Sequence, residues 1–309
     1  MRALVTGAGG FAGKYLVRHL REEGHDVAAT GRESDGCELT LDLNDVQSIR
    51  TAVETSRPDV VFHLAAQTFL PEAAHRPIHT YETNILGTAR LLAALAPTTR
   101  VFFTSSAQVY GAGFPDRRAL TEQMTLKPVE PYAASKAAGE HICVAAYHSY
   151  GQECVVARAF NHIGPGQDTR FAISSFAHQL ARIAHGAQPA RIDVGNLEVE
   201  RDFLDVRDVV RAYAVLAERG TPGEIYNVCS GTPRKIKELL RLLIARAGVA
   251  VEVREDPRRM RAGEMSCIYG DNAKLVALGW KPSIRLEQSL SDIYESAVAG
   301  TAASAGAAT

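Results

Sequence analysis

Short apolar runs alternate with longer amphipathic stretches through the first half of the chain. A short run of apolar and β-branched residues is typical of a buried strand, whereas apolar residues spaced three or four positions apart predict a helix. The runs predicted as strands are Met1–Thr6, Asp26–Thr30, a third short run that ends before Asp42, Pro58–Leu64, Arg100–Ser105 and Cys154–Arg158. Helices are predicted after the first glycine-rich turn, over Asn84–Ala96 and around Tyr132. This alternation predicts an α/β fold with a doubly wound parallel sheet and helices on both faces.

The second half of the chain is less regular. Helices are predicted over Phe171–His185, Arg207–Glu218 and Ile236–Gly248, and strand-like segments over Arg191–Val194, Asp202–Val206 and Ile225–Cys229. We expect residues 161–299 to form mainly a smaller domain, interleaved with the first because some strands between 202 and 230 rejoin the main sheet. The composition of residues 300–309, GTAASAGAAT, predicts a disordered tail.

A glycine-rich turn joins the first predicted strand to the first predicted helix. Gly7, Gly10 and Gly13 recur at every third position. The first glycine permits a tight turn, the second lets the backbone approach a pyrophosphate, and the third lets the helix pack on the strand. The N–H groups at the helix start offer hydrogen bonds to that pyrophosphate. The turn therefore predicts a Rossmann-like dinucleotide-binding domain over residues 1–160, the alternative being a purely structural turn.

The end of the second predicted strand indicates which dinucleotide binds. NAD-binding folds carry an acid there for the ribose 2′-hydroxyl, but this strand runs into Gly31 and Arg32, and no acid is present. An arginine can hold the 2′-phosphate instead, so the sequence favours NADP(H) and leaves NAD(H) open. Asp42 and Leu43, just beyond the third strand, are placed to touch the adenine. Asp42 is equally placed to be the N-cap of the following helix.

Tyr132 and Lys136 stand four residues apart in PYAASKAAGE, a segment that favours helix. That spacing places both side chains on one helical face. A fixed positive charge beside a phenol lowers its pKa from about 10, so Tyr132 is predicted to act as an acid or base near neutral pH. An ordinary amphipathic helix gives the same spacing. Ser105 and Ser106 end the fifth strand, where ligands of such sheets bind, beside the start of this helix.

Composition and charge exclude several classes of function. Lys plus Arg number 34 and Asp plus Glu 35, a net charge of -1, so no domain-wide basic field exists to hold nucleic acid or an anionic membrane. No apolar run approaches the ~18 residues of a membrane span, and the first strand begins at Arg2, which leaves no room for a signal peptide. The cysteines and histidines show no metal-ligand spacing. We expect a soluble, cytoplasmic protein without a metal.

A series of short motifs runs along nearly the whole chain. In order they are TGAGGFAG, FHLAAQ, TSSAQVYG, PYAASK, ARAFNHIGPGQ, GNLEVERDFLDVRDV, YNVCSG and MRAGE. Each motif is loose alone, but their order and spacing are highly specific. Together they resemble the extended short-chain dehydrogenases/reductases of the nucleotide-sugar-modifying branch. The resemblance implies that residues 161–299 bind a nucleotide sugar.

Within this branch, the second half is most similar to reductases that convert GDP-4-dehydro-6-deoxy-D-mannose to GDP-D-rhamnose. The resemblance implies a GDP-linked 4-keto-6-deoxyhexose as partner, hydride delivery from NADPH to C4, and protonation of the C4 oxygen by Tyr132. Ser106 would donate a hydrogen bond to that oxygen, and Lys136 would hold the nicotinamide ribose. The implied cofactor contacts are Gly7, Gly10, Phe11, Gly13, Arg32, Asp42, Leu43, Leu64, Ala65, Ala66, Tyr132 and Lys136. The implied substrate contacts are Ser105, Ser106, Gln67, Asn161, Arg201, Arg261 and Glu264.

The residues after Ser106 separate the neighbouring activities. GDP-mannose 4,6-dehydratases, the next closest resemblance, carry acidic residues there, because eliminating water needs a carboxyl donor and a base. Ala107 and Gln108 cannot exchange protons in that way, so dehydration is not expected. A 4-epimerase passes this test, although Gly31 and Arg32 argue against tightly held NAD. A reductase forming GDP-6-deoxy-D-talose and a catalytically silent nucleotide-binding sensor also stay open.

Two segments resemble the helices through which this family dimerises. Leu91–Ala96 and Ala137–Ala146 are unusually small and apolar, so the resemblance implies a homodimer, although burial against the sheet would explain them equally. Arg261 and Glu264 resemble an RPxE pattern that meets phosphate and ribose. Ala262 and Gly263 stand between them in place of the proline, which makes this loop less stiff.

Overall fold

A seven-stranded parallel sheet forms the larger layer of the protein. The computed structural model describes residues 1–112, 114, 117–260 and 265–306, with 303–306 described in their backbone only. Within these residues the strand order is β10-β6-β5-β4-β1-β2-β3. The strands are β1 (Arg2–Thr6), β2 (Asp26–Gly31), β3 (Leu39–Thr40), β4 (Val60–His63), β5 (Arg100–Ser106), β6 (Cys154–Ala159) and β10 (Ile225–Val228). The predicted α/β fold with a doubly wound parallel sheet is confirmed.

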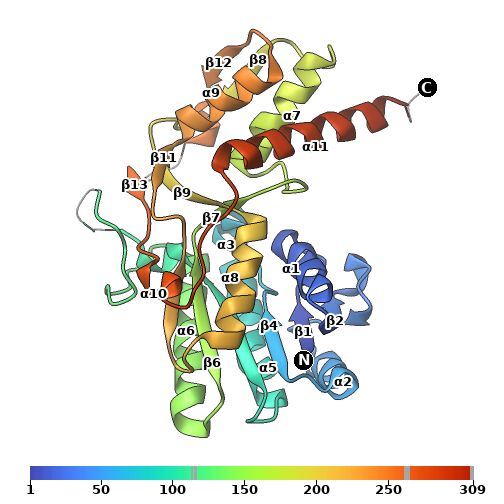
Figure 1. Cartoon of the computed structure of the whole chain (residues 1–309), viewed down its shortest axis with the longest axis vertical. Helices are drawn as coiled ribbons and strands as arrows, with labels where there is room; N and C mark the ends of the chain where they lie inside the picture. Colours follow the sequence, from blue (N-terminus) through green and yellow to red (C-terminus); the bar gives the residue numbers. More distant parts are fainter. Residues whose placement is uncertain (113, 115–116, 261–264, 307–309) are drawn as a thin grey trace.

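Helices cover both faces of this sheet (Figure 1). On one face α1 (Phe11–Glu22) and α8 (Val206–Arg219) bury residues such as Leu16 and Tyr213 against the strands. On the other face α2 (Val46–Ser56), α5 (Gly87–Ala94) and α6 (Pro131–Tyr150) enclose a second core. Because the strands are covered on both sides, they read as continuous apolar runs.

The segment between β4 and α5 differs from the single helix predicted over Asn84–Ala96. It contains α3 (Leu70–His75), α4 (Pro77–Tyr81) and a π-helical turn, η2 (Glu82–Leu86), which leads directly into α5. Single π turns occur mostly within longer helices and often lie at functional sites. Here the π turn carries Asn84, a buried polar residue.

The smaller unit is built from α7 (Ala172–Ala184), α9 (Ile236–Ala247) and α11 (Leu286–Gly306), with two small sheets (Figure 1). In one sheet β8 (Arg191–Val194) pairs with β12 (Glu252–Glu255). In the other, β9 (Glu200–Asp205) pairs with β7 (Asn161–Ile163), β11 (Pro233–Lys235) and β13 (Cys267–Ile268). The three helices share an apolar core that includes Leu180, Leu239 and Ile293. Short elements complete the chain: η1 (Glu33–Asp35), η3 (Ala107–Tyr110), η4 (Pro257–Arg259) and α10 (Ala273–Val276).

The interleaving of the two halves follows from β10 and β9. Strand β10 rejoins the main sheet beside β6, as predicted for part of 202–230. The segment predicted as Asp202–Val206 does not rejoin it, because β9 takes its partners from the smaller unit. Helix α11 continues to Gly306, beyond residue 300, where composition predicts disorder. Among the helices described, none has the length and apolarity to cross a membrane.

Candidate active site

The glycine-rich turn after β1 has the geometry that its spacing predicts. Gly7 has φ of +71°, and a Cβ at this position would lie 2.8 Å from the backbone nitrogen of Ala65. A Cβ on Gly13 would lie 2.8 Å from the Cα of Ala8, so only glycine lets α1 pack this close to the turn. Gly10 is the N-cap of α1 and provides no side-chain hydrogen bond to it. The first N–H groups of α1 are therefore arranged to receive a pyrophosphate.

The other predicted contacts to the dinucleotide surround this turn. Leu64, Ala65 and Ala66 are half-buried at the carboxyl end of β4, against Gly7. Phe11 begins α1, and its ring stacks on His162 with centroids 5.9 Å apart. These residues form a cradle that fits a nicotinamide dinucleotide.

In the loops after β2 and β3, the structure agrees less well with the contacts predicted from the sequence. Arg32 is 72% exposed, as a phosphate-binding residue can be, but its guanidinium lies 3.5 Å from Asp35. Neither Gly31 nor Arg32 is acidic, as the sequence shows, but the loop also brings Asp35 back to this strand end. Asp42 accepts a hydrogen bond from the Asn44 backbone, and the N-cap of α2 is Asp45.

Leu43 lies in the apolar core that α2 and α5 enclose. Its side chain is 4% exposed, and a Cβ on Gly87 would lie 2.7 Å from the Leu43 Cβ. The Leu43 side chain is therefore directed into the core of the domain, and its predicted contact with adenine would have to use the backbone.

The structure brings Ser106, Tyr132 and Lys136 together at the carboxyl end of β5. Tyr132 is in the first turn of α6, which Pro131 begins and whose N-cap Glu130 accepts hydrogen bonds from the Tyr132 and Ala133 backbones at 3.1 and 2.9 Å. The Ser106 hydroxyl is near enough to the Tyr132 phenol to act on its pKa. A strand end and a helix start thus meet where the sheet presents its ligands.

Burial changes the acidity of the tyrosine in the direction opposite to the prediction. The phenol is almost fully buried, which raises the pKa of Tyr132 to about 12, although the hydrogen bond from Ser106 opposes this. The expected lowering of this pKa by Lys136 is therefore wrong, because desolvation disfavours the phenolate and raises the pKa. A phenol in this state keeps its proton at neutral pH. It is prepared to give that proton to an oxygen that becomes negative during a reaction.

Lys136 is equally buried, with 3% of its surface exposed. Its ammonium donates to the Thr104 carbonyl at 2.7 Å and lies 5.0 Å above the Phe103 ring. Burial lowers the pKa of Lys136 to about 8, and the charge of Glu140 partly opposes this shift. The ammonium is thus held against β5 by the Thr104 carbonyl and the Phe103 ring.

A buried ion pair behind the site was not predicted from the sequence. Arg158 of β6 pairs with Glu140 of α6 at 2.8 Å, and the side chains are 3% and 1% exposed. The Ser105 hydroxyl donates to the same carboxylate and is 2% exposed, so the predicted contact of this hydroxyl with the sugar requires it to leave Glu140. One signal was available: Glu140 lies four positions after Lys136, on the same helical face.

A chain of neutral hydrogen bonds links the dinucleotide strand to α6 from the other side. Thr88 donates to the Asn84 carbonyl at 2.7 Å, so its oxygen accepts from His63 Nε2 at 3.0 Å. His63 Nδ1 then accepts from Thr6 at 2.9 Å, which is the neutral tautomer. Burial lowers the pKa of His63 to about 3. From β1 to α6 the chain comprises Thr6, His63, Thr88, Asn84, Ser135 and the Tyr132 carbonyl.

The predicted substrate residues are less tightly grouped. Gln67 binds the Phe69 backbone through both ends of its amide. Asn161 donates to the Asp202 carbonyl at 3.2 Å, and Arg201 donates to the carbonyls of Glu200 and Met265 at 2.8 and 2.9 Å. Arg261 and Glu264 lie outside the described residues.

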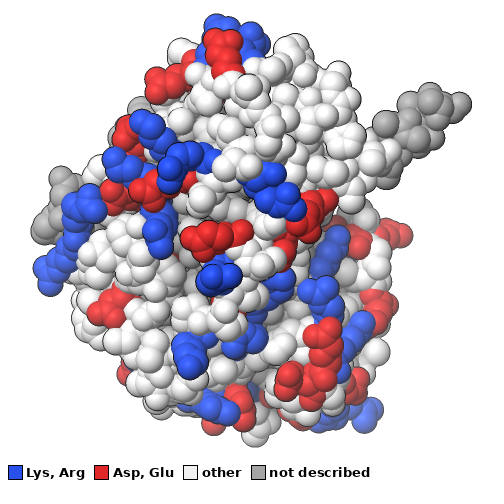
Figure 2. Space-filling view, turned by 45° about the horizontal axis from the view of Figure 1, so that its top comes forward, with Lys and Arg blue, Asp and Glu red and all other residues white. Residues whose placement is uncertain are grey.

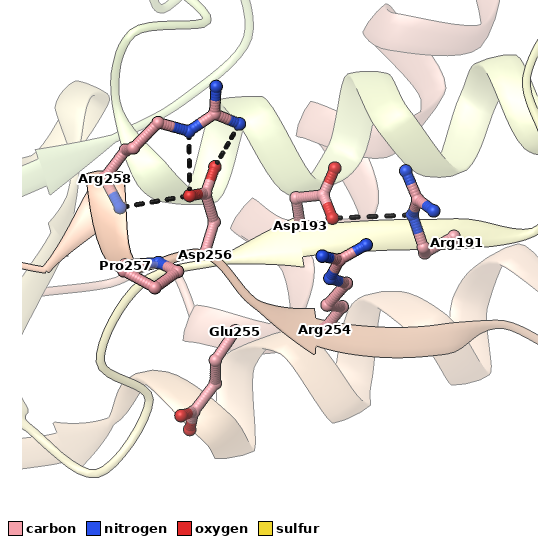
Figure 3. A pocket seen from close by; sticks show the side chains of 7 residues that line it. All are labelled: Arg191, Asp193, Arg254, Glu255, Asp256, Pro257 and Arg258. Carbon is pink, nitrogen blue, oxygen red and sulfur yellow. Dashed lines mark hydrogen bonds and ion pairs between the residues drawn. The ribbon is translucent and has the colours of Figure 1, made fainter.

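A small cavity of about 110 Å³ lies at the outer end of the smaller unit (Figure 3). Two ion pairs lie in the wall of this cavity: Arg258 with Asp256 at 2.9 Å, and Arg191 with Asp193 at 3.5 Å. Its described lining residues are Arg191, Asp193, Arg254, Glu255, Asp256, Pro257 and Arg258. Figure 2 shows that acidic and basic side chains are mixed in the same way over one face of the molecule. This cavity holds opposed charges and none of the predicted catalytic residues.

Comparison with known proteins identifies the family. A model described as GDP-mannose 4,6 dehydratase matches residues 4–293. The chain belongs to this family. It is 41% identical over 293 residues to GDP-6-deoxy-D-mannose reductase of Pseudomonas aeruginosa, covering 94% of each protein. It is 31% identical over 282 residues to GDP-6-deoxy-D-talose 4-dehydrogenase of Aggregatibacter actinomycetemcomitans, covering 89% of this chain and 90% of that protein.

A solved structure agrees with these matches. The structure of RMD from Pseudomonas aeruginosa complexed with NADPH superposes with a TM-score of 0.88 at 39% identity, covering 97% of this chain and 100% of that one. The resemblance to the extended short-chain dehydrogenases/reductases of nucleotide-sugar metabolism is therefore confirmed. The chain is therefore an oxidoreductase of nucleotide-sugar metabolism in this family, and it takes a nicotinamide cofactor.

Proposed function

We propose that the protein reduces the C4 ketone of GDP-4-dehydro-6-deoxy-D-mannose with NADPH and forms GDP-D-rhamnose. The observation that carries this proposal is the convergence of Ser106, Tyr132 and Lys136 at the end of β5, with no carboxyl group on Ala107 or Gln108 beside them. The similarity to GDP-6-deoxy-D-mannose reductase supports the substrate class. The NADPH-bound relative supports the cofactor.

Each catalytic residue has a role that its environment favours. The bound nicotinamide supplies the hydride. Tyr132, protonated because burial raises its pKa to about 12, gives its proton to the C4 oxygen as that oxygen becomes negative. Ser106 donates a hydrogen bond to the same oxygen and stabilises the developing charge. Lys136 holds the nicotinamide ribose and keeps a positive charge beside the phenol.

Three carboxylates on or close to α6 support reduction over dehydration. The Glu130 carboxylate accepts backbone hydrogen bonds at the start of α6. Glu140 is buried in its ion pair with Arg158, and Glu122 accepts from the Asn227 backbone at 2.8 Å. Elimination of water needs a carboxyl that can give up a proton to the substrate. These three carboxylates already have structural partners.

The nucleotide end of the substrate is assigned to the smaller unit. Arg201 and Arg261 would pair with the diphosphate, since guanidinium donors match phosphate oxygens. Glu264 would accept from the ribose hydroxyls, and Asn161 would bind near the sugar and diphosphate. Arg201 lies on β9, two residues before Phe203, which pairs with Asn161 of β7, and this placement is consistent with a shared ligand.

We also propose a cytoplasmic homodimer in which α5 and α6 pack against their copies. Leu86, at the end of η2 beside α5, is 49% exposed, and Ile78, on α4 next to α6, is 66% exposed. Large apolar side chains in this position favour coverage by a partner surface. Sedimentation at micromolar protein concentration tests the proposal, and a monomer there would contradict it.

The proposed reaction is tested by supplying GDP-4-dehydro-6-deoxy-D-mannose and NADPH and following absorbance at the reduced nicotinamide band. We expect oxidation of NADPH and, by NMR of the sugar, the rhamno configuration at C4. A talo configuration would reassign the product to GDP-6-deoxy-D-talose, the sugar named for the second relative. No oxidation, combined with dehydration of GDP-mannose, would overturn the reductase assignment.

A further inference from the structure

The loop after β2 folds back over the dinucleotide turn through the short helix η1. As a result Asp35 packs against the turn: a Cβ on Gly9 would lie 2.8 Å from the Asp35 Cβ. A Cβ on Gly31, the last residue of β2, would lie 3.0 Å from Asp35 Oδ2. The Asp35 carboxylate therefore lies between the pyrophosphate-binding turn and the end of β2.

The Asp35 carboxylate and the Arg32 guanidinium face the same region of the surface. Asp35 Oδ2 accepts from the Arg32 backbone at 2.9 Å, and Oδ1 lies 3.5 Å from Arg32 Nη2. The Ser34 hydroxyl donates to Oδ1 only at 3.4 Å. Both contacts to Oδ1 are longer than an ordinary hydrogen bond, so a closer donor on a ligand can take the place of the Ser34 hydroxyl. Arg32 is 72% exposed and Asp35 26%, so a ligand can reach both.

NADH and NADPH differ at one group, which binds at this end of β2. NADH presents a 2′-hydroxyl, which can donate a hydrogen bond to a carboxylate. NADPH presents a 2′-phosphate, which a carboxylate repels and a guanidinium attracts. Arg32 alone would select NADPH. The Asp35 carboxylate carries the opposite charge at the same position and weakens that selection.

We propose that Asp35 admits NADH to this site and limits its preference for NADPH. With NADH, Asp35 accepts a hydrogen bond from the 2′-hydroxyl, and Arg32 stays paired with Asp35. With NADPH, Arg32 turns from Asp35 to the 2′-phosphate, and the remaining carboxylate weakens the complex. The inference rests on the proposed use of NADPH, but the sugar substrate has no part in it.

Asp35→Asn separates the charge of this residue from its structural role. The amide oxygen can still accept from the Arg32 backbone, so the loop keeps its hydrogen bond. We expect the Kd of NADPH to fall and that of NADH to rise, each by about tenfold, the value of one charged hydrogen bond. The two constants are measured by calorimetry or by nicotinamide fluorescence with the cofactor alone. A ratio of the two constants within about twofold of the wild-type ratio would show that Asp35 only caps the loop.

Companion variants keep this test decisive. Arg32→Gln is expected to raise the Kd of NADPH by at least about tenfold and leave that of NADH nearly unchanged. Glu198→Gln removes an exposed carboxylate of the smaller unit and should change neither constant. If Asp35→Asn unfolds, Asp35→Ser, which also keeps an acceptor oxygen, takes its place under the same criterion. Because no sugar is present, failure of the ketone-reduction assay leaves this result intact.

Discussion

Helix α6, which carries Tyr132 and Lys136, is held on its two sides by a charged network and a neutral one. Toward β5 and β6, Glu140 forms a buried ion pair with Arg158. Toward η2, Ser135 accepts from Asn84 at 2.9 Å within the neutral chain of hydrogen bonds that reaches back to β1. Both networks are anchored within eight residues of Tyr132, yet only the first carries charge.

The difference between the networks is explained by Lys136, which lies between them. The negative charge of Glu140 opposes the lowering of the Lys136 pKa, whereas a charged His63 in the second network would add a cation near the ammonium. Burial keeps His63 neutral, and Lys136 contributes to this by repulsion. Of the two networks, the one that contains a carboxylate supports the protonated form of Lys136, and the other stays neutral.

The ion pair gives the largest expected effect on stability. Glu140→Gln leaves the Arg158 guanidinium buried without its counter-charge, which should lower the free energy of unfolding by about 3–5 kcal/mol. The exposed pair of Arg246 and Glu295 is the matched control, and Glu295→Gln should cost less than about 1 kcal/mol. Urea unfolding measures both variants. Equal costs would mean that the buried pair is not what holds this side of α6.

The neutral network predicts a specific dependence of stability on pH. His63 has a native pKa of about 3 against about 6.5 when unfolded, so between these values the unfolded state binds the extra proton. The contribution of His63 to the free energy of unfolding is complete above the pKa of the unfolded state. It is lost as pH falls toward 3, with a slope approaching 1.4 kcal/mol per pH unit. His63→Gln should lack this component between pH 6.5 and 5. Identical pH profiles for both proteins would refute a neutral, buried His63.

A single link of the neutral network gives the smallest effect. Ser135→Ala removes the acceptor of Asn84 and the donor to the Tyr132 carbonyl, at a cost of about 1–2 kcal/mol. Asn84 keeps its hydrogen bond to the Gln67 carbonyl at 2.9 Å, which limits the loss. Thermal unfolding measures the cost. A loss as large as that of Glu140→Gln would remove the distinction between the two networks.

The strands of the main sheet and the helices of the second half could be predicted from the sequence, but the pairing of the short strands in the second half could not. The strands of the sheet are separate apolar runs, and the glycine turn and the Tyr132–Lys136 spacing are local patterns. Strand β9 instead pairs with β7, β11 and β13, segments far apart in the chain and only two to six residues long. Such pairing is decided by tertiary packing, which no local pattern records.

The sequence predicts that Ser106, Tyr132 and Lys136 lie near one strand end, and the structure places them there. Their catalytic roles stay a prediction, and their electrostatics could not be predicted from spacing. The sequence places Lys136 beside Tyr132 and therefore predicts a lowered pKa, whereas the structure buries the phenol and raises it. Asp35 was missed for a related reason, because a loop returns it to the end of β2. Burial and loop return depend on the whole fold, so spacing alone cannot predict them.

The central claim is that Tyr132 donates the proton during ketone reduction. Tyr132→Phe keeps the ring and removes only the hydroxyl, so measuring turnover of GDP-4-dehydro-6-deoxy-D-mannose and NADPH affinity on the same preparation tests the claim directly. We predict that kcat falls about 10²–10⁴-fold while the Kd of NADPH stays within about twofold of the wild-type value. A kcat within about tenfold of wild type would contradict the assignment of Tyr132 as the proton donor.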